Sequence, residues 1–494
     1  MFYLGIDSGT QSTKSIVLDF ETGEIVAQSS KAYDLIDGLP AGHLEQHPSD
    51  WVEAVKSTVS DCLAQLGERK NELRGIGVSG QQHGLVVLDA EDKVVRPAKL
   101  WCDTSTTDQC DQFAAAFGGT SGLIEKAGNV MLPGYTIPKL LWLKQNEPEN
   151  FAKTKSVQLP HDYLNFFLTG IKRMEFGDAS GMGILNIPEK TWETDLIDFV
   201  DSSVHEMLPE LGSSNVVHGT LRPELAQEWG ISSDVIVSAG GGDNMMGAIG
   251  TGNISDGIIT ASFGTSGTLY GCAENPVIDP NGEIAAFCDS TDRWMPLACT
   301  MNVTVVTEQV REWFGWDLAE LERQVDSVAP GADGVSFLPY LNGERTPNLP
   351  NGTGVIHGLG GQSASPAHLA RAAMEGATLG LAYGLRRFAA LGLTPEEIRL
   401  TGGGSKSAVW RQISADVFGV PVVGLATSEG AGLGGAIQAA HADGKGSYDE
   451  LCGRLVSLDE STRCAPNQEH SALYSEKLDR QIEMTLLLKE AGLL

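Results

Sequence analysis

The sequence contains two short loops rich in glycine and threonine, one near the start and one just past the middle. The first loop, residues 7–10 (Asp-Ser-Gly-Thr), lies between apolar runs at residues 2–6 and 15–18. The second, residues 264–268 (Gly-Thr-Ser-Gly-Thr), also separates two runs that favour strands. Such turns gather backbone N–H groups and hydroxyls, which suit phosphate oxygens. Because each loop begins one half of a long chain, we expect a duplicated fold that holds a nucleoside triphosphate from both sides.

The length of the chain, 494 residues, exceeds what one hydrophobic core usually supports. We therefore expect two large domains, an N-terminal domain of residues 1–252 and a C-terminal domain of residues 253–494. Between the loops, strands at residues 2–30 and 73–78 alternate with a helical pattern at residues 51–66. This alternation predicts an α/β fold with parallel or mixed sheets. Residues 100–230 resemble an insertion of helices and loops.

The net charge of −30, from 64 acidic and 34 basic residues, argues against a nucleic-acid partner. No apolar run is long enough to span a membrane, and the N-terminus lacks a basic segment followed by an apolar one. The eight cysteines are scattered and form no CxxC pair. We therefore expect reduced thiols and a cytoplasmic protein without a membrane partner.

Asp7 ends the first strand beside the first loop. A carboxylate at this position can hold Mg²⁺ or its waters next to bridging phosphates. The alternative is an aspartate whose side chain turns back to its own backbone. The presence of Lys14, four residues after Thr10, and of the second loop favours the phosphate site.

Asp243 follows three glycines at the end of a strand and precedes a helical segment. Ligands meet α/β sheets at strand ends, and a helix N-terminus stabilises negative charge. A carboxylate there can accept the proton of a substrate hydroxyl as it attacks phosphorus. The alternative is an aspartate that caps the helix, and capping is compatible with catalysis. We predict that Asp243 is the catalytic base.

Three further glycine-rich segments have two readings each. His83, in residues 80–84, lies with Gln82 at a strand end and could meet sugar hydroxyls or serve only the structure. The loop at residues 402–407 could admit a base or ribose, or be a plain turn. Residues 430–435 match GxGxxG, but the second strand of a βαβ unit is missing. We interpret these last glycines as contacts of a closely packed helix.

Together these residues resemble the FGGY carbohydrate kinases, within the superfamily of sugar kinases, actin and heat-shock ATPases. The resemblance runs nearly end to end. It includes the C-terminal signature at residues 354–375, with Gly354, Ile356 and Glu375 in place. Within the family, the chain is most similar to xylulose kinases. The segments that carry this similarity are residues 80–84, 100–103, 129–142, 241–244, 337–347 and 402–412.

The resemblance implies a two-domain actin-like ATPase fold, related to ribonuclease H, with an active-site cleft between the domains. It implies ATP-dependent phosphorylation of D-xylulose to D-xylulose 5-phosphate in D-xylose catabolism, with ATP and Mg²⁺. Asp243 is then the base and Asp7 the carboxylate on the metal side. The sugar ligands implied are Gln82, His83, Asp243 and Asn244. The ATP ligands implied are Thr10, Lys14, Gly264, Thr265, Gly403, Gly404 and Ser407. A homodimer is an expectation from the family alone.

Three other functions are compatible with parts of this pattern. The first is a kinase of the same family for another ketopentose or a polyol, because relatives share the ATP site and differ in few pocket residues. The second is a catalytically silent sugar sensor, which the intact Asp7 and Asp243 disfavour. The third is a chaperone-type ATPase, which the long insertion and the motif at residues 241–244 disfavour.

Overall fold

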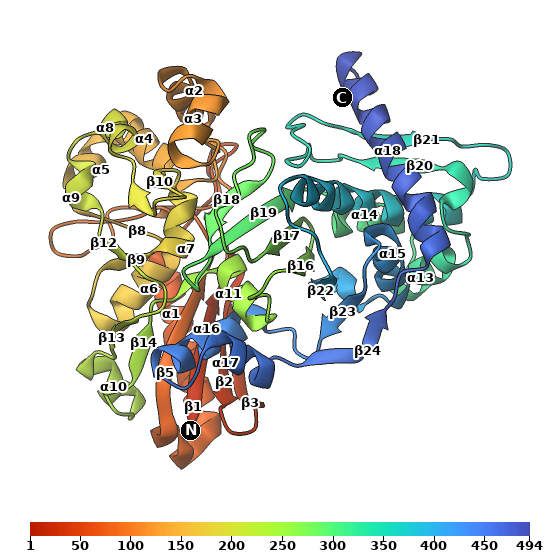
Figure 1. The fold of residues 1–494 in the computed structure, drawn as a ribbon. Coiled ribbons are helices and arrows are strands. Elements are labelled where there is room, and N and C mark those ends of the chain that lie inside the picture. The colour runs from red at the N-terminus through yellow and green to blue at the C-terminus, as the bar shows by residue number, and fades with distance from the viewer.

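The computed structural model describes residues 1–494, and two seven-stranded sheets organise them (Figure 1). The N-terminal sheet contains β1 (Phe2–Ser8), β2 (Ser12–Asp19), β3 (Ile25–Ala32), β5 (Leu73–Gly80), β13 (Val217–Thr220), β14 (Ile236–Ser238) and β15 (Gly241–Gly242). The C-terminal sheet contains β16 (Ile258–Phe263), β17 (Gly267–Gly271), β18 (Ala285–Cys288), β19 (Trp294–Thr300), β22 (Glu397–Thr401), β23 (Val422–Leu425) and β24 (Leu458–Cys464).

The two sheets repeat one pairing pattern. In the first, β1 pairs antiparallel with β2 and parallel with β5, and β2 pairs antiparallel with β3. In the second, β16 pairs antiparallel with β17 and parallel with β22, and β17 pairs antiparallel with β19. Each loop rich in glycine and threonine is the turn of the leading hairpin. The predicted duplicated α/β fold is therefore confirmed.

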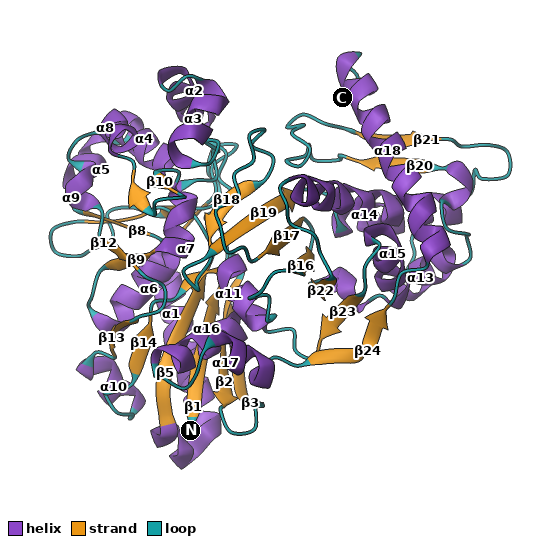
Figure 2. Cartoon of the chain, viewed as in Figure 1, coloured by secondary structure: helices purple, strands orange, loops and turns teal.

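Helices surround both sheets (Figure 2). They are α1 (Pro48–Leu66), α2 (Thr107–Ala116), α3 (Gly119–Ala127), α4 (Thr136–Asn146), α5 (Pro148–Lys153), α6 (Pro160–Thr169), α7 (Phe176–Ala179), α8 (Thr194–Val200), α9 (Val204–Met207), α10 (Pro223–Trp229), α11 (Asp243–Gly250), α12 (Thr304–Phe314), α13 (Leu318–Asp326), α14 (Pro366–Ala390), α15 (Ala408–Phe418), α16 (Gly430–Ala442), α17 (Tyr448–Leu455) and α18 (Gln468–Glu490). The short strands are β4 (Glu45–Gln46), β6 (Val86–Leu88), β7 (Ala98–Lys99), β8 (Ser156–Gln158), β9 (Arg173–Glu175), β10 (Leu185–Asn186), β11 (Thr191–Trp192), β12 (Glu210–Gly212), β20 (Ser336–Pro339) and β21 (Gly354–His357).

Side-chain alternation along β1 explains how helices cover both faces of the N-terminal sheet. Phe2, Leu4 and Ile6 share a buried cluster with residues of α1. Tyr3 points the other way, into a cluster with residues of α11, α16 and α17. Successive side chains of a strand point to opposite faces, so a strand buried on both sides is apolar throughout.

The insertion predicted at residues 100–230 is only partly correct. Helices α2 to α5 and α7 to α9, with short strands, fill most of it around a buried core of their own, but the buried apolar side chains of α6 join the core of the main sheet. The strand β13, however, already belongs to the main sheet, where it pairs antiparallel with β14. The insertion therefore ends before residue 217, because the chain has returned to the edge of the sheet by then.

Helix α16 belongs to the C-terminal half of the sequence but packs on the N-terminal sheet. Figure 1 shows it, in blue, against the red strands. A Cβ atom at Gly5 would overlap the carbonyl oxygen of Gly432, and one at Gly77 would overlap that of Gly435. The interpretation of residues 430–435 as close-packing glycines is thus confirmed. The domain boundary between residues 252 and 253 stays a prediction. A single boundary does not describe α16, which follows it in sequence but packs on the sheet that precedes it.

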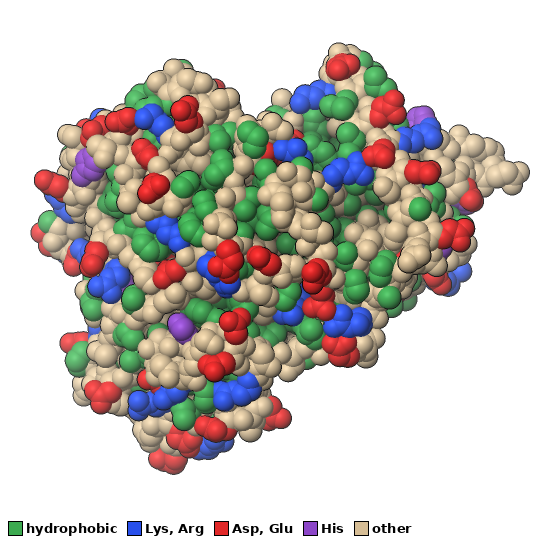
Figure 3. Space-filling view, in the orientation of Figure 1, with side chains coloured by type: hydrophobic (Ala, Val, Ile, Leu, Met, Phe, Trp, Pro, Cys, Tyr) green, Lys and Arg blue, Asp and Glu red, His purple; other side chains and the backbone are tan.

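On the face drawn in Figure 3, acidic side chains are spread among basic and polar ones, and a hollow separates the lobes that carry α2 and α18. The high negative charge is therefore not gathered into one patch on this face. None of the helices combines the length and the apolar character needed to cross a lipid bilayer.

Candidate active site

Asp7 and Asp243 lie at the ends of neighbouring strands of the N-terminal sheet. In the register of the sheet, Ser79 of β5 is paired with Asp7 on one side and with Gly241 of β15 on the other. The Ser79 hydroxyl donates to Asp7 Oδ1 over 3.1 Å. Asp243 follows β15 directly and is the first residue of α11. Residues 236 positions apart in sequence thus lie together at the carboxyl ends of the strands, because β1, β5 and β15 run parallel.

The surroundings of these two carboxyl groups move their pKa values upward. Burial raises the pKa of Asp243 to about 7, and the charges of Asp7 and Asp178 act in the same direction, against hydrogen bonds from Asn244. Burial also raises the pKa of Asp7 to about 6, although Ser79 opposes the shift. A general base works best when its pKa is near the operating pH. Asp243 therefore has the basicity that proton abstraction from a hydroxyl needs near neutral pH.

The loop at residues 80–84 is named here the sugar loop after the ligand that the resemblance implies for it, and it contacts the Asp243 helix. Asn244 Nδ2 donates to Gln82 Oε1 over 2.7 Å and to Asp243 Oδ1 over 3.0 Å. Two buried atoms of this loop, Gln82 Nε2 and His83 Nδ1, have no hydrogen-bond partner in the protein. Buried polar atoms are rarely left unpaired, so these two atoms are candidates for contact with a polar ligand.

Aromatic rings enclose His83. The ring centroids of Tyr135 and Phe287 lie 5.2 and 5.6 Å from that of His83. Burial lowers the pKa of His83 well below its ordinary value, and the charges of Lys139 and Arg345 add to this. The imidazole is therefore neutral and can both donate and accept a hydrogen bond. The sequence offered no local signal for Phe287, which reaches this place from β18 in the other half of the chain.

The two glycine-rich turns direct their carbonyl oxygens into the protein. The Tyr33 hydroxyl donates to Gly9 O, and Gln46 Nε2 to Thr10 O, each over 2.6 Å. In the second turn, the backbone N–H groups of Val303 and Thr304 donate to the carbonyls of Thr265 and Gly264, each over 3.0 Å. The amides of Thr10 and Thr265 donate to no backbone carbonyl. Such free N–H groups are the donors that a phosphate needs.

The side chains of Thr10 and Lys14 are already engaged. The Thr10 hydroxyl accepts from Trp101 Nε1 over 2.9 Å and donates to Gln81 Oε1 over 3.1 Å. Lys14 Nζ lies 3.4 Å from the carboxylate of Glu429, just before α16. In this arrangement only the Thr10 backbone is free for a phosphate, and Lys14 would have to leave Glu429. Their roles as ATP ligands stay predictions.

The loop predicted to meet adenosine packs against the second glycine-rich turn. Gly402 has φ of +82°, and a Cβ atom there would lie 2.7 Å from the carbonyl carbon of Phe263, the residue before Gly264. Gly403 has open space around it. The Ser407 hydroxyl accepts from the Trp410 N–H over 3.2 Å and so caps α15. Gly403, Gly404 and Gly264 are thus brought together, while Ser407 has a structural role that the sequence alone did not separate from ligand binding.

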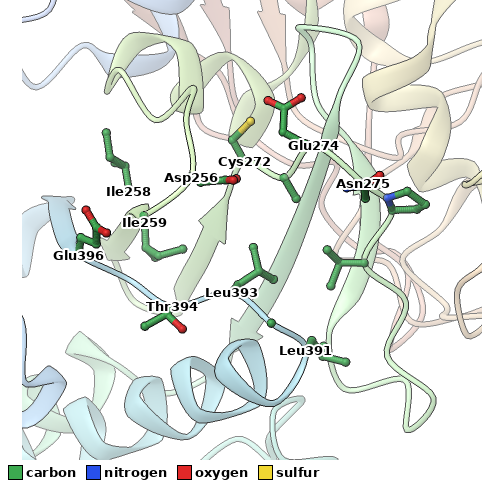
Figure 4. Close-up of a pocket in the computed structure, with 15 residues that line it drawn as sticks. Asp256, Ile258, Ile259, Cys272, Glu274, Asn275, Leu391, Leu393, Thr394 and Glu396 are labelled. Atoms are coloured by element: carbon green, nitrogen blue, oxygen red, sulfur yellow. The ribbon is translucent and has the colours of Figure 1, made fainter.

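Two other polar features lie apart from Asp243. His43, Glu45 and Asp103 form a cluster whose centre is filled by the ammonium of Lys99, 3.0 Å from Asp103 and 3.2 Å from Glu45. A pocket of about 460 Å³ lies between the start of β16, the end of β17 and the loop after α14 (Figure 4). Its walls combine apolar side chains with Asp256, Glu274 and Glu396. None of the predicted site residues lines it.

The sequence matches known proteins along almost its whole length. Residues 2–250 match the N-terminal domain, and residues 259–442 the C-terminal domain, of the FGGY family of carbohydrate kinases. The chain is 43% identical to xylulose kinase from Haemophilus influenzae over 486 residues, 97% of this chain and 98% of that protein.

Solved structures agree with this match. Ligand-bound xylulose kinase from Lactobacillus acidophilus aligns with a TM-score of 0.92 and 27% identity, covering 99% of this chain and 98% of that one. A gluconate kinase structure from the same organism aligns with the same TM-score, identity and coverage. With both family domains matched and the strand-end carboxylates in place, the chain belongs to the FGGY family of carbohydrate kinases.

Proposed function

We propose that this protein phosphorylates the 5-hydroxyl of D-xylulose with ATP, giving D-xylulose 5-phosphate and ADP. The observation that carries the proposal is the pair of buried, unpartnered atoms Gln82 Nε2 and His83 Nδ1, on the loop that contacts Asn244 beside Asp243. A neutral polyhydroxy ligand supplies partners for both atoms without bringing a charge among the carboxylates. A phosphorylatable sugar is such a ligand.

In the proposed reaction Asp243 accepts the proton of the 5-hydroxyl as the bond from that oxygen to the γ-phosphorus forms. The bond between the γ-phosphorus and the oxygen bridging to the β-phosphate breaks, and ADP leaves. Little covalent chemistry falls to the protein in phosphoryl transfer, so its work is positioning and electrostatics. Asp243 positions the hydroxyl, and the turn amides of Thr10 and Thr265 can hold the phosphate oxygens. Closure of the cleft between the two halves then excludes water.

Asp7 is the residue that would hold Mg²⁺. It is a carboxylate at the edge of the sheet, and its side-chain partner within hydrogen-bond distance is the hydroxyl of Ser79. Although burial raises its pKa to about 6, the carboxyl is mostly ionised at neutral pH, so it can bind a cation without first losing a proton. Bound Mg²⁺ would offset the negative charge of the transferring phosphate. The residue therefore suits a hard divalent cation.

The choice of D-xylulose rests on sequence similarity, because the fold does not separate sugars. The two Lactobacillus acidophilus structures with different sugar names align equally well. Relatives at 34–43% identity are xylulose kinases. A second candidate, a kinase for gluconate, has the structural likeness alone in its favour. The unpaired cysteines suit a reducing compartment, and we place the reaction in the cytoplasm. Whether the protein is a homodimer stays an expectation.

A coupled ADP-release assay with Mg·ATP tests the proposal. The sugars compared are D-xylulose, L-xylulose, D-ribulose, L-ribulose, L-fuculose, D-gluconate and glycerol. We expect the highest kcat/KM with D-xylulose. Preference for another sugar would keep the kinase mechanism and reject the substrate. Absence of stimulation by every sugar, in a folded protein that binds ATP, would favour the silent sensor.

A further inference from the structure

A fully buried imidazole and carboxylate lie behind the active site. His161, the second residue of α6, and Asp178, in α7, are both 0% exposed. His161 Nδ1 lies 2.9 Å from Asp178 Oδ2, and His161 Nε2 lies 2.9 Å from Asp162 Oδ1. Burial lowers the pKa of His161, but the two carboxylates outweigh it and raise the pKa well above its ordinary value. A protonated imidazole thus lies between two acidic groups.

This imidazole is packed between the two loops that lead to the proposed sugar ligand and base. A Cβ atom at Gly80, where the sugar loop begins, would lie 2.8 Å from His161 N. A Cβ atom at Gly240, three residues before Asp243, would lie 3.0 Å from the ring atom Cδ2 of His161. Both loops therefore touch one residue, and glycine at both positions makes room for it.

Asp178 also faces the sugar loop. The backbone N–H of His83 is close enough to Asp178 to lower the pKa of its carboxyl, against the larger effect of burial. Asp178 Oδ1 makes no hydrogen bond that meets full geometric criteria. The carboxyl of Asp178 therefore has an oxygen without a hydrogen bond, and it lies near the backbone N–H of His83 without a hydrogen bond of full geometry between the two. Hydrogen bonds in active sites without ligand are often long and tighten when substrate binds.

The conformation of His83 requires such support. Its φ of +64° lies in the left-handed region, which is costly for a residue with a side chain. Its carbonyl accepts from Lys139 Nζ over 2.8 Å and from Thr136 Oγ1 over 3.1 Å. A Cβ atom at Gly181 would overlap the His83 ring. The carbonyl is therefore held by two donors and the ring is packed against Gly181, while no backbone or side-chain acceptor fixes the N–H.

We propose that Asp178, held by His161, is a positioning residue that fixes the backbone of His83 for sugar binding and tightens its contact with that N–H when the sugar enters. The inference rests on the proposed function. An asparagine at residue 178 has one acceptor oxygen, so it cannot serve both the imidazolium and the His83 N–H. An aspartate has two.

Asp162 provides a matched control. It is a buried carboxylate at the same 2.9 Å from the same imidazole, and its Oδ2 accepts from the Leu159 N–H at the start of α6. It has no contact with His83 among its hydrogen bonds. Asp162→Asn and Asp178→Asn thus each remove one carboxylate charge from beside the same imidazole, and only Asp178 also lies near the His83 N–H.

The test compares wild type, Asp178→Asn and Asp162→Asn in the coupled assay. For Asp178→Asn we expect kcat/KM for D-xylulose to fall on the order of 10²-fold, with a higher KM for the sugar. The KM for ATP and the rate of ATP hydrolysis without sugar should stay within about twofold of the wild-type values, because the nucleotide site is not altered. Asp162→Asn should lose thermal stability but keep the KM for D-xylulose. Equal sugar kinetics in both folded variants would overturn the inference. Absence of wild-type turnover with D-xylulose would instead reject the proposed function.

A second measurement needs no variant, should Asp178→Asn not fold. Hydrogen exchange at the His83 amide of the wild-type protein is followed with and without D-xylulose. Exchange should slow when the sugar binds, because the N–H···Asp178 bond closes. Unchanged exchange at this amide under saturating sugar would overturn the inference.

Discussion

The first hairpin, β1–β2, and the second, β16–β17, have the same strand pairing and both end in a turn rich in glycine. Their surroundings differ. The strand parallel to β1 is β5, which continues into the sugar loop, and Asp243 lies one strand further on. The strand parallel to β16 is β22, which continues into the glycines at residues 402–404. The first turn therefore faces carboxylates and amides, whereas the second faces a loop of bare backbone.

This difference indicates how a duplicated fold became asymmetric. Both halves provide the same backbone donors for phosphate oxygens. Beside the first turn lie two carboxyl groups with raised pKa values, Asp7 and Asp243. Beside the second turn, Gly403 has open space around it. On our account the first half therefore carries the chemistry and the sugar, and the second half holds the nucleotide.

Loss of the proposed base should produce the largest effect. Asp243→Asn keeps the shape of the side chain but cannot accept a proton. We expect kcat with D-xylulose to fall by about 10²–10⁴-fold, with ATP affinity nearly unchanged. Steady-state kinetics measures the loss, and circular dichroism controls for folding. Turnover within a few-fold of wild type would remove Asp243 from the role of base.

The metal-side carboxylate should come next. Asp7→Asn removes the charge proposed to hold Mg²⁺, and we expect kcat to fall about 10²-fold. More Mg²⁺ should also be needed for half-maximal activity, because the remaining ligands are neutral. A titration of activity with Mg²⁺ at fixed ATP measures both. An unchanged Mg²⁺ requirement would contradict the assignment of Asp7.

A substitution where α16 packs on the N-terminal sheet should reduce stability without altering a proposed catalytic residue. A Cβ atom at Gly77 would overlap the carbonyl of Gly435. Gly77→Ala should therefore reduce the free energy of unfolding by about 1–3 kcal/mol. Gly453→Ala is the control, since a Cβ atom there meets nothing within 4 Å. Equal melting temperatures for the two variants would show that this contact relaxes freely.

A smaller effect is expected on the nucleotide side. Thr265→Val removes one hydroxyl at the second turn and leaves its N–H in place. Loss of one hydrogen bond corresponds to about 1 kcal/mol, or about a fivefold higher KM for ATP. The KM for D-xylulose should not change. Steady-state kinetics with each substrate varied in turn checks this, and a larger rise in the sugar KM would contradict the division between the halves.

The pH dependence of stability gives a separate signal, in melting temperature and not in turnover. The folded pKa of Asp243, about 7, lies above its ordinary value of 3.8, so the folded protein binds the proton more tightly than the unfolded chain. Stability from this group is therefore present below about pH 4 and is lost as pH rises to about 7. The Asp243→Asn variant does not lose stability in this way, because an asparagine side chain does not titrate. Its melting temperature relative to wild type should rise between pH 4 and pH 7, and a constant difference would contradict the raised pKa.

The sequence alone was sufficient to locate the strand ends, because each of them is marked by a local pattern. The loops at residues 7–10 and 264–268 and the glycines before Asp243 mark strand ends, and parallel strands bring such ends to one edge. The return of α16 to the first sheet was not predictable in this way, because it depends on contacts such as Gly435 with Gly77. The contact of His161 with the sugar loop likewise joins segments about 80 residues apart. No periodicity within either segment encodes that pairing.

The division between the halves is tested most directly by calorimetric titration of D-xylulose and of a non-hydrolysable ATP analogue into two variants. Gln82→Leu removes a buried polar side chain of the sugar loop, and Thr265→Val alters the second turn. We predict a crossed pattern, in which Gln82→Leu weakens sugar binding and keeps ATP binding, while Thr265→Val does the reverse. Loss of both affinities in each variant, or the opposite pairing, would contradict the account.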